Sequence, residues 1–127
     1  MVSFENFIIE DGIPIYLQIA LHVKRGIAAG LIEDREELPS RRALSALLAI
    51  NPNTVQKAYK ILEDEGLMES QPGAKSIMRL YAAKAAAVKQ ELLGEGMERV
   101  VTDLQVMGLS LQESIDLLKK YWKEGEG

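Results

Sequence analysis

The chain has 127 residues, of which 47% are hydrophobic and 27% are charged, and its formal net charge is −4. This composition is typical of a folded domain with a small appendage and excludes a chain dominated by low-complexity disorder. The absence of cysteine excludes disulfides and thiolate metal sites, and the lack of a signal peptide or of a run of about 18 apolar residues predicts a cytoplasmic protein without a membrane segment.

The N-terminal part is expected to form an arm and a first helix. Residues 1–13 are interpreted as an arm with a short strand in "FIIE". Pro14 suits the first turn of a helix, because the N–H that proline lacks has no partner there. Gly30 supplies a stop, and the residues between carry apolar side chains at helical spacing: Ile15, Ile19, Val23 and Ile27. A polar connector, "LIEDREELP", follows.

Two further helices are predicted after the connector. Ser40 is a favoured N-cap for "RRALSALLA". Residues 50–52 are expected to form a tight turn, with Asn53 capping a third helix, "TVQKAYKILEDE", that stops at Gly66. At about 100° per residue, one face of this third helix is apolar and contains Val55, Ala58, Tyr59 and Leu62. The opposite face is polar and cationic without a carboxylate, and contains Asn53, Gln56, Lys57 and Lys60.

A hairpin is predicted behind the third helix. "LMES" and "SIMRL" are interpreted as two short strands joined by a Pro-Gly turn in "QPGAK". Two helices joined by a short turn form a helix-turn-helix, and a hairpin after the second of them forms a wing. Residues 1–80 are therefore predicted to be a winged helix-turn-helix DNA-binding domain. Its segment from Leu38 to Glu63 has four bases and no acid before its last residue, as expected of a surface that meets phosphate.

Residues 81–127 are predicted to be a two-helix dimerisation region, which makes the fold class mainly α with a small β-hairpin. Gly94 and Gly96 mark a shift in the apolar stripe and would kink the helix, break it or permit close packing. Gly108 ends it, and Ser110 to Glu113 form a capping box for the last helix. The stripes can pack on their own winged domain, but pairing with a second copy is favoured, because two helices cannot bury such stripes alone. The residues assigned to this pairing are Val88, Leu92, Met97, Val100, Leu104, Leu111, Ile115 and Leu118.

Four motifs together resemble the GntR family of bacterial transcription regulators. They are "PIYLQIA", "LPSRRAL", "INPNTVQKAY" and "LEDEGLMES", and the resemblance covers residues 14–80. The turn "INPNTV" and the short helical tail look most like the YtrA subfamily. This resemblance implies a brief helical dimerisation region in place of a ligand-binding effector domain.

The resemblance also implies roles for individual residues. Ser40 and Arg42 match positions that contact phosphate, and Gly73 matches the wing tip. Arg41 takes a position that is usually acidic or apolar and adds a candidate contact. The wing departs from the usual "G-x-G-T" pattern, which leaves Lys75 as its candidate phosphate contact. Asn53, Thr54, Gln56 and Lys57 match the start of the recognition helix. Lys60, from its place on the polar face of this helix, is expected to be a contact to the DNA backbone or a free charge.

Physical chemistry supports these roles independently. A helix N-terminus has free N–H groups and a favourable dipole for phosphate, and a nearby guanidinium can pair with it. Gln56 can pair with adenine, and Lys57 can reach guanine or phosphate. Tyr59 is expected to pack in the core, with a contact from its hydroxyl to phosphate as the alternative. His22, the only histidine, is expected at the helix surface or core edge and not in a metal site.

The sequence thus predicts a homodimeric transcription repressor that binds double-stranded DNA at a palindromic operator. No cofactor and no enzyme activity are predicted, because no nucleophile–base set or Gly-rich phosphate loop stands out. The alternative is a winged-helix protein–protein interaction module without DNA binding. The lysine-bearing, acid-free face argues against that alternative, because protein interfaces are poor in lysine. The sequence does not name an effector, the operator or the target genes.

Overall fold

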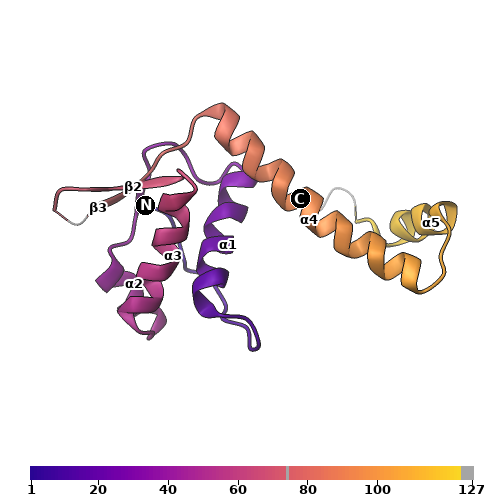
Figure 1. Ribbon diagram of the computed structural model, residues 1–127, viewed down its shortest axis with the longest axis horizontal. Coiled ribbons are helices and arrows are strands. Elements are labelled where there is room, and N and C mark those ends of the chain that lie inside the picture. Colours follow the sequence, from indigo (N-terminus) through magenta and orange to yellow (C-terminus); the bar gives the residue numbers. More distant parts are fainter. Residues whose placement is uncertain (74, 124–127) are drawn as a thin grey trace. The chain divides into compact units, whose positions relative to one another are not determined.

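The computed structural model describes residues 1–73 and 75–123. The chain divides into two units after Leu92, whereas the sequence placed the domain boundary after residue 80. The helices are α1 Ile15–Ala28, α2 Arg41–Leu48, α3 Pro52–Asp64, α4 Ala82–Val106 and α5 Leu111–Tyr121 (Figure 1). The strands are β1 Glu37–Leu38, β2 Met68–Gln71 and β3 Lys75–Met78. The mainly helical fold class with a helix-turn-helix and a β2–β3 wing is confirmed.

The sheet contains one strand more than the sequence indicated. Its antiparallel order is β1-β3-β2, and β1 comes from the segment that was interpreted as a polar connector. The strand β1 has only two residues, too few to show an alternating pattern in the sequence. The strand expected in "FIIE" is wrong: residues 7–10 form no strand, and Ile8 is 80% exposed. The arm instead inserts Val2 and Phe4 into the core, and the Val2 N–H donates to the Glu37 carbonyl over 2.8 Å.

The core of the first unit lies between α1, α3 and the sheet. The predicted apolar face of α3 is confirmed, because all four of its side chains are fully buried: Val55, Ala58, Tyr59 and Leu62. Ile19 and Val23 of α1 are also fully buried. Each fully buried Val, Ile or Leu side chain among them contributes about 1.5–3 kcal/mol to folding, and the same packing fixes which face of α3 remains outside.

Capping fixes where α2 and α3 begin. The Ser40 hydroxyl accepts a hydrogen bond of 3.0 Å from the Ala43 N–H, as predicted. The cap of α3 is Asn51 and not Asn53, because the Asn51 side chain accepts from the Asn53 N–H over 2.8 Å. Pro52 then occupies the first helical position, where its missing N–H has no consequence. The recognition helix therefore starts one residue before Asn53.

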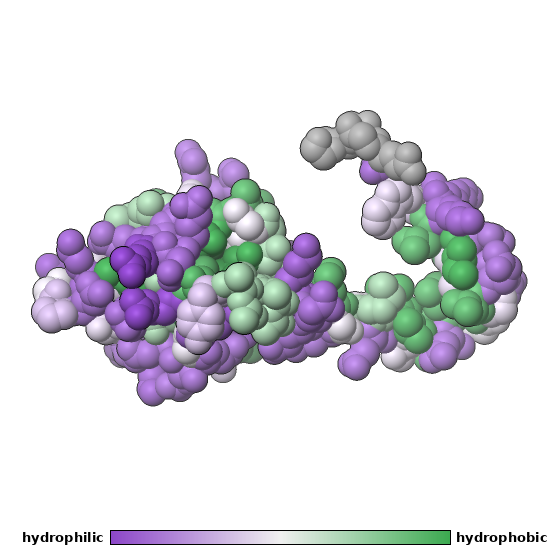
Figure 2. Space-filling view, turned by 90° about the horizontal axis from the view of Figure 1, so that it is seen from above, coloured by the Kyte–Doolittle hydropathy of each residue, from purple (hydrophilic) through white to green (hydrophobic). Residues whose placement is uncertain are grey.

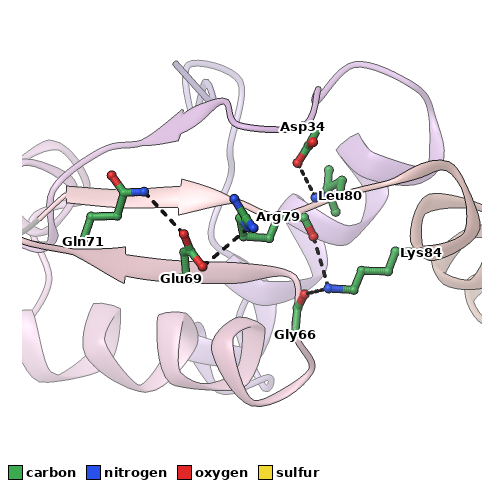
Figure 3. Close-up of polar contacts among 7 residues, drawn as sticks. All are labelled: Asp34, Gly66, Glu69, Gln71, Arg79, Leu80 and Lys84. Atoms are coloured by element: carbon green, nitrogen blue, oxygen red, sulfur yellow. Dashed lines mark hydrogen bonds and ion pairs between the residues drawn. The ribbon is translucent and has the colours of Figure 1, made fainter.

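The start of α4 belongs to the first unit. Its Lys84 ammonium donates to the carbonyl of Gly66, and it also lies 3.4 Å from that of Arg79 (Figure 3). The Asp34 carboxylate accepts from the Leu80 N–H over 2.7 Å just before the helix begins. Val88 is buried against the same core. The first turns of α4 are therefore part of the winged domain.

The second unit contains the rest of α4 and α5. Helix α4 continues through Gly94 and Gly96 without a break. Gly108, with φ +81°, ends the segment, and the predicted capping box is present. The Ser110 hydroxyl accepts from the Glu113 N–H over 3.1 Å, and the Glu113 carboxylate accepts from the Ser110 N–H over 2.9 Å. The hydrogen bond from the Ser110 backbone N–H to this carboxylate lowers the pKa of Glu113, and the Ser110 side chain lowers it further. None of the helices in the described ranges has the length and apolarity needed to cross a bilayer.

Candidate nucleic-acid interface

Two helix N-termini lie close to each other in the chain and carry no acid. The first turns of α2 and α3 contain no acidic residue, although one there stabilises a helix by about 0.3–1 kcal/mol. The sequence instead begins α2 with Arg41 and Arg42, whose charges oppose the helix dipole. This arrangement is unfavourable in the free protein and favourable once an anion approaches. The two termini are thus suited to phosphate.

The two adjacent arginines have different surroundings. Arg42 is exposed, and its side chain has no hydrogen bond or ion pair with any residue in the part of the chain that the structure describes. Arg41 is half-buried and turns inward, with its guanidinium carbon 5.6 Å from the centroid of the Tyr59 ring. Its Nη2 donates to the Ser70 hydroxyl in β2 over 3.4 Å. Of the pair, Arg42 is the one free to meet a phosphate.

The outer face of α3 carries the predicted polar residues. Asn53, Gln56, Lys57 and Lys60 are exposed, and Thr54 is half-buried. The Lys57 ammonium lies 4.8 Å from the Tyr16 ring centroid, which draws the charge toward α1. Three exposed candidates for base contacts, Asn53, Gln56 and Lys57, therefore lie at the start of the helix beside the half-buried Thr54.

Lys60 differs from its neighbours because it already has a partner. Its Nζ lies 2.6 Å from Oδ1 of Asp64, one turn further along α3. This hydrogen bond, with the charge of the same carboxylate, raises the pKa of Lys60. The charge on Lys60 is thus partly neutralised within the helix. Lys60 and Asp64 are four residues apart in the sequence, a spacing that allows an ion pair on a helix. The acid-free segment ends at Glu63, one residue before Asp64.

Tyr59 is fully buried, and its hydroxyl donates a hydrogen bond of 2.6 Å to the Pro39 carbonyl. The core position is confirmed, and the alternative contact to phosphate does not fit this geometry. Burial raises the pKa of Tyr59, against a smaller opposing effect of the Arg41 charge. Sequence reasoning did not find the Tyr59–Pro39 bond, because no pattern links these two positions.

The wing adds two candidate contacts. Gly73 lies at its tip with φ +83°, and Lys75 begins β3 with an exposed side chain. Within the wing, the Arg79 Nε lies 3.5 Å from a Glu69 carboxylate oxygen, and the Gln71 amide donates to the same carboxylate (Figure 3). Because Arg79 is paired, Lys75 is the more available cation of the wing.

Acids collect at the opposite end of α3. The C-terminal end of the helix carries Glu63, Asp64 and Glu65. The Glu65 carboxylate forms an ion pair of 2.6 Å with the Lys24 ammonium of α1. The Lys84 ammonium donates a hydrogen bond to the carbonyl of Gly66, the residue after Glu65. Charge is therefore separated along the helix axis, with the acids away from the predicted DNA-facing end. This separation explains how an acidic chain presents a cationic surface.

His22 has a structural role in this fold. Its ring lies 4.6 Å from that of Phe4 and 5.2 Å from that of Phe7, measured between centroids. Its Nε2 is 2.8 Å from the Ser3 carbonyl oxygen, an acceptor that requires the proton on this nitrogen. Within residues 1–73 and 75–123, no group of three or more His, Asp or Glu side chains is placed to hold a metal ion.

Comparison with known proteins agrees with this geometry. Residues 15–76 match the family model described as bacterial regulatory proteins, gntR family. The HTH-type transcriptional repressor YtrA of Bacillus subtilis is 32% identical over 116 residues, which cover 90% of this chain and 88% of YtrA. A YtrA structure from Sulfolobus acidocaldarius, a GntR-family transcription factor, superposes with a TM-score of 0.58 at 30% identity, covering 79% of this chain and 99% of that one.

The fold itself is matched over most of its length. A GntR family transcriptional regulator from Listeria monocytogenes superposes with a TM-score of 0.83 at 24% identity, covering 90% of this chain and all of that one. The winged helix, the family model and the similarity to YtrA over both units lead to one conclusion. The chain belongs to the GntR family, with its YtrA-type members as relatives, and it is a DNA-binding transcription regulator.

Proposed function

We propose that the chain is a homodimeric repressor that occupies a palindromic operator through the N-terminal ends of α2 and α3. The observation that carries this proposal is the pair of acid-free helix starts, of which one holds Arg42, a side chain without a partner among the described residues. Ser40, Arg42 and Lys75 contact phosphates, and the exposed residues at the start of α3 read base edges. The bound dimer represses transcription by occupying a promoter and needs no catalytic activity. The protein acts in the cytoplasm. The similarity to a protein named as a repressor supports this direction of regulation.

The dimer is proposed from the second unit. Large apolar side chains gather on α5 and on the end of α4, where Figure 2 shows them exposed. Met97 is 57% exposed, Leu111 78% and Leu118 56%. A monomer rarely leaves such a patch in water, so a second copy is its proposed cover. The surface is formed by Met97, Val100, Leu104, Leu111, Ile115 and Leu118 of the predicted set.

Two residues of that set have another place in the structure. Val88 is buried in the core of the first unit, and Leu92 packs against that core. The side chain of Val88 is therefore unavailable to a partner and that of Leu92 is partly covered, so we leave both out of the proposed dimer surface. Leu104 is half-buried, and together with Leu109 and Leu111 it lines a pocket of about 140 Å³ between α4 and α5.

A two-fold dimer makes a geometric prediction about the operator. Its recognition helices enter successive major grooves on one side of the duplex, about 34 Å apart or a multiple of that distance. The experiment is selection from a random double-stranded DNA library at about 150 mM salt, a concentration at which nonspecific phosphate binding is weak. An enriched inverted repeat supports the proposal, and its spacing gives the dimer geometry. No enriched sequence, with retention that vanishes as salt rises, would contradict it and favour the protein-interaction alternative.

A further inference from the structure

We infer that Arg41 is a positioning residue that braces the wing against the helix-turn-helix and does not neutralise a phosphate. The sequence makes Arg41 an added candidate for a phosphate contact beside Arg42, since they are adjacent and both begin α2. Adjacent helical residues point about 100° apart, however, so the two arginines can have different surroundings. The structure assigns the exposed position to Arg42.

The Arg41 side chain is held by two elements that are distant in the sequence. The guanidinium carbon lies 5.6 Å from the Tyr59 ring centroid in α3, and Nη2 donates to the Ser70 hydroxyl in β2 over 3.4 Å. Its Nε is buried and has no hydrogen-bond partner among the described residues. A guanidinium placed in this way has already lost much of its water, and reaching a phosphate would require leaving the ring and the strand.

The surface beneath Arg41 is rigid. Tyr59 is fully buried, and its hydroxyl is fixed on the Pro39 carbonyl. An aromatic ring that is fixed by core packing and by its hydroxyl bond is a suitable surface for stacking a planar guanidinium. Lysine has no planar group and cannot stack in the same way. Arg41 therefore sits on a fixed point of the helix-turn-helix.

The other end of the brace is the wing. Ser70 lies one residue before the end of β2 and pairs with Ser76 of β3, which in turn pairs with Leu38 of β1. A hydrogen bond to Ser70 thus acts on the outer part of the hairpin and not on its base. The brace restricts the motion of the wing relative to α3. Without it, DNA binding has to order the wing, and affinity falls although the number of phosphate contacts is unchanged.

The test compares Arg41→Gln with Arg42→Gln across a salt titration. The probe is the most enriched duplex from the library selection, measured at 15–20 °C, about the range where domains of this kind are most stable. Each neutralised phosphate contributes about 0.9 to the slope of log affinity against log salt. We expect Arg41→Gln to lose about tenfold in affinity, the effect of one hydrogen bond to a charged group, with the wild-type slope. Arg42→Gln is expected to lose affinity with a slope shallower by about 0.9.

A mutant cycle and hydrogen exchange make the role specific. Ser70→Ala and Arg41→Gln are expected to be non-additive, because each removes the same contact. Amides of residues 69–71 and 75–77 are expected to exchange faster in free Arg41→Gln than in free Arg42→Gln, a result that needs no DNA. A shallower slope for Arg41→Gln would make Arg41 a phosphate contact. Unchanged affinity together with unchanged exchange would make it a passive surface residue. Either result overturns the inference, and neither affects the proposed repressor function, which fails only if wild type selects no operator.

Discussion

The hydroxyl of Tyr59 donates a hydrogen bond of 2.6 Å to the carbonyl of Pro39, the residue before the Ser40 cap of α2. One buried contact therefore fixes the middle of the recognition helix to the start of the helix that carries Arg42. This bond links the two elements whose N-terminal ends carry no acid. The relative position of the phosphate contacts and the base contacts is thus set by the core and not by the surface.

Tyr59→Phe is expected to destabilise the first unit by about 1–3 kcal/mol, because it leaves the buried Pro39 carbonyl without its partner while keeping the ring in place. Urea denaturation followed by circular dichroism measures the loss. Tyr81→Phe is the matched control, since the Tyr81 side chain is 64% exposed. Equal stability of the two variants would mean that the hydroxyl contributes nothing to the fold.

The same residue predicts a loss of stability in alkali. Burial raises the pKa of Tyr59 above its ordinary value of about 10. At high pH the folded state therefore holds a proton that the unfolded state releases. The contribution of Tyr59 is fully present below about pH 10 and is lost as pH rises above that value. Wild type is expected to lose more stability than Tyr59→Phe between pH 9 and pH 11.5, roughly the range that brackets this transition. Parallel curves for the two proteins would rule out Tyr59 as the titrating group.

Arg42→Glu is expected to abolish DNA binding while the fold remains intact. The side chain is exposed and has no partner in the described part of the chain, so its removal costs little stability. A carboxylate at the same place repels the phosphate that Arg42 is proposed to meet. Fluorescence anisotropy with a labelled duplex measures the loss. Lys89→Glu, an exposed change of the same size in charge on α4, controls for net charge.

Asp64→Asn is expected to strengthen DNA binding. The carboxylate of Asp64 lies 2.6 Å from the Lys60 ammonium and withholds that charge from the duplex. Freeing Lys60 gives a contact that steepens the salt dependence by up to about 0.9. The matched double variant Asp64→Asn with Lys60→Gln is expected to lose this gain. An Asp64→Asn protein with the wild-type slope and affinity would show that Lys60 does not approach the DNA backbone.

The local patterns in the sequence predicted the fold well. The four fully buried residues of α3, the Ser40 cap and the Ser110–Glu113 box all depend on spacing within one turn or helix, which the sequence displays directly. The cap of α3 was misplaced by two residues because Asn51 and Asn53 are both suitable caps. Only the position of Pro52 decides between them, since proline fits the first helical position.

Contacts between distant segments could not be predicted in this way. The strand β1 is visible only through its pairing with β3, and two residues carry no alternation. In the candidate site, too, local patterns were predictable and contacts between distant segments were not. The exposed face of α3 was found, whereas the inward turn of Arg41 depends on Tyr59 and on Ser70, 29 positions away. Local periodicity contains no information about that separation.

Met97→Glu and Val88→Ala are expected to separate the two roles of α4. Met97 is 57% exposed in the second unit, so a carboxylate there leaves the monomer stable and places charge in the proposed dimer surface. We expect Met97→Glu to elute as a folded monomer in size-exclusion chromatography with light scattering, and to bind an inverted repeat no better than a half-site. Val88 is 8% exposed within the core of the first unit. Val88→Ala is expected to cost about 1–3 kcal/mol of stability and to leave the dimer intact. A dimeric Met97→Glu protein would exclude this face as the interface. A Val88→Ala protein that is monomeric and fully stable would place the start of α4 in the dimer interface.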